Sequence, residues 1–443
     1  MKKVAIIGGG FGALNVAWQL SNIAGPDKLQ IDVFEQDQQL AGTAGGFQEK
    51  NWAWTLEKHY HHLFAKDRAF QNFLKSLGLE EKLFFKKTKT STRWQGKNFQ
   101  LDSALSLLAF QELSFFDRLR TGVVLAFLKI LPNGQFLEKY PASVFLQKTM
   151  GQKPWQIIWQ PLFKSKFSTW AADINMAWFW ARIKPRTVKL AYVEGGFQSL
   201  ASEIQKKLSK KGVKFHLQER VEKIYLPNQA KNKQAYFKLK IKSLKNQSKS
   251  TQEKKYDLVI STLPSTQFQK LAALSELKDD HLRGLSAMTM VLRLKEPLLP
   301  DKIYWLNINE KRWPFLAVVE HDHFIDNQYY NHEHLIYLGR YLSSDEPAYR
   351  QSAKTVWQSY LPYLRKLNPN VEQLLIEYRL YKEDFAQPLV KVNHSQHLPK
   401  MRTSCPKLYW VSTQHIYPFD RGLNQAIVAS NQLVAEIKQD FGF

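Results

Sequence analysis

The chain has almost no cysteine, since Cys405 is the only one among 443 residues. An internal disulfide and a zinc site with paired cysteines are therefore excluded, and we expect a reducing compartment, the cytoplasm. Long hydrophobic runs are also lacking, because residues 121–131 are interrupted by Lys129 and fall short of the roughly 20 residues that span a bilayer. No removable leader is visible before the strand-like residues 4–7, so we expect a structural amino terminus.

Acidic residues are few as well. The chain has 39 of them against 63 basic residues, which gives a formal charge of +24. With 44% hydrophobic and 23% charged residues it is neither disordered nor fibrous. The basic residues are scattered or confined to residues 231–255, without a recognised nucleic-acid module. We therefore expect weak attraction to anionic membranes, no specific binding of nucleic acid, and a small molecule as the main partner.

A glycine turn follows the first apolar run. Residues 4–7 have the length of a buried parallel strand, and a helix with apolar positions at helical spacing opens directly after it. The turn fits the GxGxxG/A pattern of dinucleotide-binding units, in which glycines allow a tight turn and close approach to a pyrophosphate, and a small last residue lets the helix pack on the sheet. The residues of this predicted site are Gly8, Gly10, Phe11, Gly12 and Ala13.

An acidic residue ends the next predicted strand, residues 31–35. Glu35 lies 22 residues beyond Ala13, where a carboxylate can accept hydrogen bonds from ribose hydroxyls. Gln36, which follows it, is also predicted to bind the cofactor, and a second glycine segment, Ala41-Gly42-Thr43, comes shortly after. Strand, turn, helix and strand form a βαβ unit with an expected right-handed crossover. This unit suits FAD and NAD alike.

Further motifs occur in the order of a known family. Residues 192–200 contain Gly195-Gly196 at the start of a helix, residues 219–221 end at Val221, residues 260–264 form an apolar strand, and residues 408–412 precede DRGLNQA at 420–426. With the amino-terminal motifs, they resemble the flavin-containing amine oxidase superfamily, which includes protoporphyrinogen oxidases, carotenoid-type desaturases and, more distantly, UDP-galactopyranose mutases. Thr43 stands where that family usually has the arginine of a GGR motif, which removes one charge-assisted phosphate contact.

The resemblance implies FAD as the cofactor. It places Gly42 and Thr43 at the diphosphate and the backbone of Val221 at the adenine. It places the segment with Asp420, Leu423 and Asn424 at the flavin, where a helix amino terminus points toward the pyrimidine side of the ring.

The order of elements and the resemblance indicate an α/β fold. We expect a Rossmann-like FAD/NAD(P)-binding domain, formed by residues 1–85, 187–270 and 401–443, interleaved with an α+β substrate domain of residues 86–186 and 271–400. Long helices are expected from about residue 67 to 186, and strands at 304–305, 313–319 and 335–341. The lysine-rich residues 231–255 predict a solvated hairpin around an alternating strand.

Twelve histidines include three clusters, at residues 59–62, 321–323 and 332–334. Each can in principle supply metal ligands, but no cysteine or HExxH pattern supports a metal site, and we predict none. The first cluster, within KHYHHLF, resembles the GxH segment that lies along the flavin in the mutases and in protoporphyrinogen-oxidase-like proteins. On that resemblance His61 lies nearest the ring and titrates near neutrality, so that it can assist proton transfer. The alternative is a buried histidine packed behind the flavin.

The aromatic residues, 13% of the chain, concentrate in stretches such as WQIIWQPLF and MAWFWARI. We interpret these mainly as helix core, with a pocket for a planar or lipophilic substrate as the alternative. The predicted function is an FAD-dependent oxidoreductase that removes a hydride from a C–N or C–C centre. One alternative is an FAD-dependent sugar-nucleotide mutase without net oxidation. Another is a membrane-peripheral electron-transfer flavoprotein. A basic face beside the 121–131 helix would favour this alternative.

Overall fold

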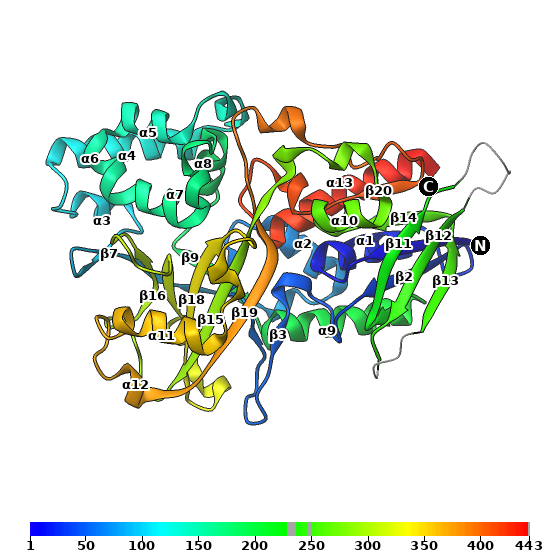
Figure 1. The fold of residues 1–443 in the computed structure, drawn as a ribbon, viewed down its shortest axis with the longest axis horizontal. Helices are drawn as coiled ribbons and strands as arrows, with labels where there is room; N and C mark the ends of the chain where they lie inside the picture. Colours follow the sequence, from blue (N-terminus) through cyan, green and yellow to red (C-terminus); the bar gives the residue numbers. More distant parts are fainter. Residues whose placement is uncertain (228–235, 246–249, 442–443) are drawn as a thin grey trace.

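The computed structural model describes residues 1–227, 236–245 and 250–441 (Figure 1). Its helices alternate with strands near both ends of the chain and cluster between residues 104 and 183. The helices are α1 Phe11–Ile23, α2 Arg68–Leu77, α3 Ala104–Leu108, α4 Phe115–Ile130, α5 Ala142–Met150, α6 Gln152–Pro154, α7 Gln160–Phe167, α8 Met176–Ile183, α9 Gly196–Lys210, α10 Ser265–Ala272, α11 Ala353–Leu364, α12 Val371–Leu374 and α13 Leu423–Phe441.

A five-stranded parallel sheet draws its strands from both ends and the middle of the chain. Its order is β10-β2-β1-β14-β20, and the ladder pairs Val4 with both Ile31 and Leu258. These strands are β1 Lys2–Ile7, β2 Leu29–Glu35, β10 Lys214–Leu217, β14 Leu258–Ser261 and β20 Leu408–Trp410. The α/β fold class is confirmed, with the strand-turn-helix-strand unit at the amino terminus.

The two faces of this sheet are covered differently, as the alternation of β1 shows. Val4 and Ile6 belong to a core shared with α1, α9 and α13, whereas Ala5 and Ile7 pack toward β11–β13 and α10. Because side chains alternate along a strand, residues 4–7 are apolar throughout and both faces of the sheet are buried. The covering three-stranded sheet has the order β11-β12-β13, with β11 Glu219–Tyr225, β12 Phe237–Ser243 and β13 Thr251–Tyr256.

A seven-stranded sheet builds the other half of the molecule. Its order is β19-β15-β18-β17-β16-β7-β8, antiparallel except where β16 pairs with β7. Helix α11 packs into one of its cores through Trp357 and Tyr360, and the helical lobe α4–α8 packs into another core that Tyr341 joins. The strands are β7 Lys89–Trp94, β8 Lys97–Gln100, β15 Gly284–Leu294, β16 Ile303–Ile308, β17 Ala317–Glu320, β18 His334–Leu342 and β19 Leu375–Pro388.

Two small sheets join these halves. One pairs β3 with β4, and the other has the order β5-β9-β6. Their strands are β3 Gly46–Phe47, β4 Leu56–Glu57, β5 Leu63–Phe64, β6 Leu83–Lys87 and β9 Lys189–Val193. The segment between β4 and β5 contains the first histidine cluster.

Three expectations about single elements are corrected. Residues 83–100 were expected within a helical region but form β6–β8, because Lys, Thr and aromatic residues alternate there around a turn at Gln95 and Gly96, which both have positive φ. The strand expected at 313–319 begins only at Ala317. In the lysine-rich hairpin Phe237, Leu239 and Ile241 are buried, so one face is core rather than solvated; its residues 231–235 and 246–249 lie outside the described part.

The interpretation of the aromatic stretches as helix core is confirmed. Trp155, Phe163, Trp178 and Phe179 are each exposed by 4% or less, and Phe163 packs tilted on Trp155, edge-to-face on Trp178 and stacked on Phe179. None of the helices within the described residues combines the length and the hydropathy that crossing a bilayer requires.

A glycine at the start of α9 allows a close backbone approach. Gly196 has φ +84°, and a Cβ there would lie 2.5 Å from Thr55 Oγ1 and 2.6 Å from the Thr55 carbonyl oxygen. We expect Gly196→Ala to lower the free energy of unfolding by about 1–3 kcal/mol, because both strain and overlap would be introduced. Gly25→Ala is the control, since a Cβ at Gly25 meets no atom within 4 Å. Equal thermal unfolding midpoints for the two variants would contradict this prediction.

Candidate functional site

The carboxyl ends of the parallel strands meet at one edge of the five-stranded sheet. Gly8 follows β1, Glu35 ends β2, Thr262 follows β14 and Thr413 follows β20. In open parallel sheets ligands bind in the crevice outside this edge. The predicted glycine turn and acidic residue therefore share this edge with residues from the end of the chain.

The glycine turn leaves room for a ligand. Gly8 has φ +105°, and a Cβ there would lie 2.3 Å from Thr262 Oγ1, so only glycine fits. Gly10 caps α1 without a side chain, and a Cβ there would meet nothing within 4 Å. The first-turn N–H groups of α1, beginning at Phe11, have no partner within the helix, which is the arrangement that binds phosphate.

The two residues after Phe11 serve packing. Gly12 brings α1 against α13, because a Cβ at Gly12 would already touch the Ala426 carbonyl oxygen at 3.7 Å. Ala13 is fully buried. The Phe11 ring packs on Phe70 and Phe197, so only its backbone N–H faces the predicted ligand.

Glu35 is buried behind the turn. Its Oε2 accepts a hydrogen bond from the Gly9 N–H at 2.8 Å, and its Oε1 accepts one from the Asp37 N–H at 2.9 Å. Burial raises the pKa of the Glu35 carboxyl. Gln36 is exposed, and the Gln218 N–H donates to the Asp37 carbonyl at 3.0 Å, which brings the start of β11 beside this carboxylate.

Val221 lies two residues into β11, buried and paired with Ile241.

The second glycine segment lies against the first. The Ala41 N–H donates to the Gly9 carbonyl at 2.9 Å, and a Cβ at Gly42, which has φ +55°, would lie 3.2 Å from Gly10 Cα. Thr43 is exposed beside this contact. Two glycine segments thus present backbone at one place, as a diphosphate requires.

Polar groups after β20 complete the edge. Within the described residues, Thr413 Oγ1 and Gln414 Oε1 are buried without a hydrogen-bond partner. Unsatisfied buried groups are costly and call for a partner outside the protein chain. Together with the open space at Gly10 and the N–H groups of α1, they fit a dinucleotide cofactor such as FAD. Neither Thr413 nor Gln414 was predicted, because residues 413–414 lie between two motifs, at 408–412 and 420–426, and belong to neither.

The predicted residues near α13 have different surroundings. Asn424 Oδ1 accepts a hydrogen bond from the Phe70 N–H at 3.0 Å, so it satisfies an N–H in the first turn of α2. Leu423 is buried at the start of α13. Asp420 is engaged in an ion cluster with residues of the helical lobe.

The Asp420 cluster consists of Asp420, Lys166, Arg182, Arg421, Trp178 and Tyr341. Asp420 Oδ2 lies 2.8 Å from Arg182 Nη1 and 3.1 Å from Lys166 Nζ, and Trp178 Nε1 donates to Asp420 Oδ1 at 3.3 Å. Burial opposes ionisation, but Lys166 and Arg182 hold the pKa of Asp420 far below its usual range. Burial also lowers the pKa of Lys166 to about 7, against the attraction of Asp420.

Aromatic rings line this cluster. Lys166 Nζ lies 5.3 Å from the Tyr341 ring centroid and 5.6 Å from that of Trp178, and the Arg421 guanidinium carbon lies 5.0 Å from Tyr341. The Tyr341 hydroxyl also accepts a hydrogen bond from Arg421. Neither Lys166 nor Arg182 was predicted; the signal was a cation close to aromatic residues in each helix, Lys166 between Phe163 and Phe167 and Arg182 two residues after Trp180.

The first histidine cluster lies between the two halves of the molecule. His61 Nδ1 lies 2.6 Å from the His59 carbonyl oxygen, His59 Nδ1 lies 2.7 Å from Thr289 Oγ1, and His62 Nδ1 lies 3.2 Å from the Tyr304 hydroxyl. Burial, reinforced by Arg421, lowers the pKa of His61 to about 4. The expectation that His61 titrates near neutrality is therefore wrong, and the ring is neutral at pH 7.

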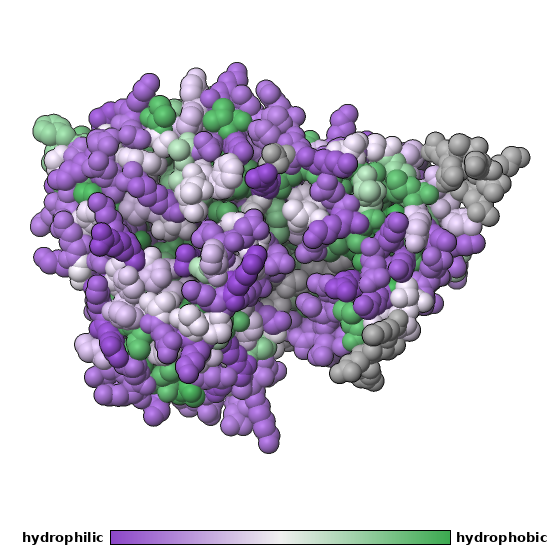
Figure 2. All heavy atoms as spheres, viewed as in Figure 1, coloured by the Kyte–Doolittle hydropathy of each residue, from purple (hydrophilic) through white to green (hydrophobic). Residues whose placement is uncertain are grey.

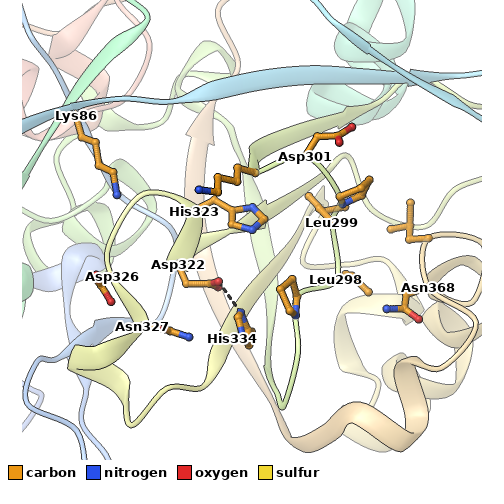
Figure 3. Close-up of a pocket in the computed structure, with 14 residues that line it drawn as sticks. Lys86, Leu298, Leu299, Asp301, Asp322, His323, Asp326, Asn327, His334 and Asn368 are labelled. Atoms are coloured by element: carbon orange, nitrogen blue, oxygen red, sulfur yellow. Dashed lines mark hydrogen bonds and ion pairs between the residues drawn. The ribbon is translucent and has the colours of Figure 1, made fainter.

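A separate pocket of about 730 Å³ opens on the seven-stranded half (Figure 3). It contains Asp322 and His323, which with Glu320 could in principle hold a metal ion. Their atoms are already engaged, since Glu320 accepts from the Leu298 and Leu299 N–H groups and Asp322 lies 2.7 Å from His334 Nδ1. None of the residues that line this pocket belongs to the glycine turn.

Comparisons with known proteins agree with the geometry. The family model described as flavin containing amine oxidoreductase matches residues 14–431. No curated protein matches the chain in sequence. The solved structures that resemble it include a protein of Exiguobacterium sp. 255-15 provisionally described as a protoporphyrinogen oxidase, with TM-score 0.74, 16% identity, and 99% of each chain covered.

Two other resembling structures have different activities. Reduced UDP-galactopyranose mutase gives a TM-score of 0.72 at 13% identity, covering 99% of this chain and 96% of that one. Cyclohexylamine oxidase from Brevibacterium oxydans IH-35A gives 0.68 at 12% identity, covering both chains fully. At such identities the structures establish a shared fold, and the family match implies FAD.

Replacing the acidic residue of the edge tests its predicted role. We expect Glu35→Ala to weaken FAD binding by about 1–3 kcal/mol, because ribose hydroxyls would lose their acceptor. Gln39→Ala, an exposed residue four positions further on that is not among the predicted cofactor-binding residues, is the control and keeps the affinity of the parent. The measurement is titration of the apoprotein with FAD by flavin fluorescence. Unchanged affinity of Glu35→Ala would show that the ribose is held elsewhere.

Proposed function

Because this chain belongs to the flavin containing amine oxidoreductase family and is an FAD-dependent oxidoreductase, we propose that it removes a hydride from a C–N or C–C centre of a lipophilic or planar substrate. The substrate lies at the Asp420 cluster. The observation that carries this proposal is the position of that cluster directly before α13, with the aromatic rings of Trp178 and Tyr341 as walls.

The surrounding side chains supply an aromatic lining. Tyr60 approaches Gly339 so closely that a Cβ there would lie 2.8 Å from the Tyr60 ring, and Tyr60 also packs on Trp305 at 5.0 Å. Phe419 packs on Trp180 at 6.0 Å. Such a mostly aromatic site with a few charged groups suits a ligand that is flat and has one polar end.

The chain's own residues have two tasks in this reaction. When bound, FAD supplies the hydride acceptor. Loss of a hydride and a proton converts the substrate's single bond into C=N or C=C, so a protein group must accept the proton. Lys166 Nζ is suited to this role, because its pKa of about 7 leaves a large fraction of the amine free at neutral pH. Asp420, which Arg182 also contacts, holds the side chain in place.

A second candidate is a sugar-nucleotide mutase, which one observation favours. The Asp420 cluster has three cations, Lys166, Arg182 and Arg421, for a single carboxylate. A diphosphate would balance this excess of positive charge. The two candidates differ in whether net oxidation of the substrate takes place.

The function is tested by anaerobic incubation of the FAD-loaded protein with amines, isoprenoids, porphyrinogens and UDP-sugars, while flavin absorbance is followed. We expect bleaching by one of the first three classes. Isomerisation of a UDP-sugar only by the pre-reduced protein, with no bleaching by any compound, would instead establish the mutase.

A comparison of His61→Ala with His62→Ala tests whether the neutral His61 ring affects the rate of flavin reduction. We expect such an effect, because His61 lies near Arg421.

The pH dependence tests the role of Lys166. Below pH 7 its amine is protonated and cannot accept a proton, so we expect the rate of flavin reduction to rise as the pH increases through about 7. In Lys166→Met, flavin reduction should be slow and its rate should not rise as the pH increases through 7. Lys164→Met, which removes an exposed lysine of the same helix, should keep this rise. A rise that persists in Lys166→Met would assign the titration to another group.

A further inference from the structure

Helix α4 has apolar residues on two sides. Thr121 and Leu128 are buried against the lobe. A second set recurs every three or four residues along the opposite side, and all of its members are exposed: Phe116 79%, Leu119 48%, Val123 61%, Phe127 48% and Ile130 76%. At that spacing they form one continuous stripe along the helix. Packing among the residues that the structure describes does not account for this stripe.

Neighbouring elements extend the stripe. Leu105 of α3 is 79% exposed, and Phe136, Tyr140 and Val144 are 55%, 51% and 45% exposed. These side chains together with the α4 stripe are called the α4 face here. Figure 1 shows α3–α6 at one end of the molecule, opposite β11–β13, and Figure 2 shows hydrophobic side chains exposed at that end. An exposed apolar surface of this kind marks an interaction site.

The α4 face is held in shape by its own arginines. The guanidinium of Arg118 donates to the Leu108 carbonyl, and Arg120 Nε donates to the Thr149 carbonyl at 2.5 Å. These bonds tie α3 and α5 to α4. The face therefore needs no partner in order to form.

The charge around the face selects its partner. Residues 113–153 contain six basic residues and two acidic ones, and Lys139, Lys148 and Lys153 are exposed. A second copy of this chain would bring two surfaces of like charge together. An anionic bilayer instead offers negative headgroups to the lysines and an acyl boundary to the apolar stripe.

We propose that the α4 face docks the protein on the surface of anionic membranes, with α4 lying in the plane of the headgroups and Phe116 and Phe127 inserted at the acyl boundary. This inference goes beyond the proposed reaction and does not depend on it. The face is exposed apolar surface with a basic border, and α4 is too short to cross the bilayer.

Vesicle flotation of the full-length, FAD-loaded protein tests this inference. Binding is expected to vesicles of phosphatidylcholine with added phosphatidylglycerol, and to be weaker with phosphatidylcholine alone or in high salt. Phe116→Ser combined with Phe127→Ser should reduce partitioning roughly tenfold or more, since two apolar anchors are lost. The matched control, Leu226→Ser with Ile376→Ser, removes two exposed apolar residues elsewhere and should bind as the parent does.

A pair of charge reversals separates the electrostatic part. Lys139→Glu with Lys148→Glu should abolish the preference for anionic vesicles, whereas Lys206→Glu with Lys210→Glu on α9 should retain it. Flavin content and thermal midpoint report that every variant is folded. Equal partitioning of the Phe116/Phe127 variant and its control would overturn the proposal. The proposal would also be overturned if the parent formed dimers and did not bind vesicles, and if the Phe116/Phe127 variant no longer formed those dimers.

Discussion

The carboxylate of Asp420, whose side chain is 19% exposed, joins parts of the chain that nothing in the sequence connects. Lys166 of α7 and Arg182 of α8 lie 254 and 238 residues before it, and both reach the same oxygen. Removing one partner of a buried ion pair leaves an uncompensated charge and costs about 3–5 kcal/mol, so this contact constrains how the helical lobe sits against the segment before α13. The aromatic walls of the site depend on that placement.

The same contact leaves the site with excess positive charge. Arg421 adds a third cation beside Lys166 and Arg182. The carboxylate of Glu383 also attracts the guanidinium of Arg421. Release of the Lys166 proton near pH 7 reduces the repulsion among these cations without breaking the pair of Asp420 with Arg182. An amine that has lost its proton near neutral pH can accept one from a substrate, which connects the architecture of the cluster to its proposed chemistry.

The difference between local and distant contacts explains what the sequence could predict. The glycine turn, Glu35 and the βαβ unit are encoded within about 35 residues, so chain chemistry alone predicted a dinucleotide site at the sheet edge, whereas the choice of FAD over NAD came from the family resemblance. By contrast, Lys166 and Arg182 acquire their meaning only from Asp420, far along the chain, and in sequence they look like ordinary helix cations. The neutrality of His61 also escaped prediction, because its pKa is set by burial and by Arg421, 360 residues away.

Helix α8 connects the cluster with the α4 face through its two sides. On one side Trp178 and Arg182 contact Asp420. On the other, Trp180 Nε1 donates to the Leu131 carbonyl at 3.3 Å and Lys184 Nζ donates to it at 2.8 Å, so α8 satisfies the carboxyl end of α4. Helix α8 and the residue that follows it thus contact both the Asp420 cluster and the end of the helix that carries the α4 face.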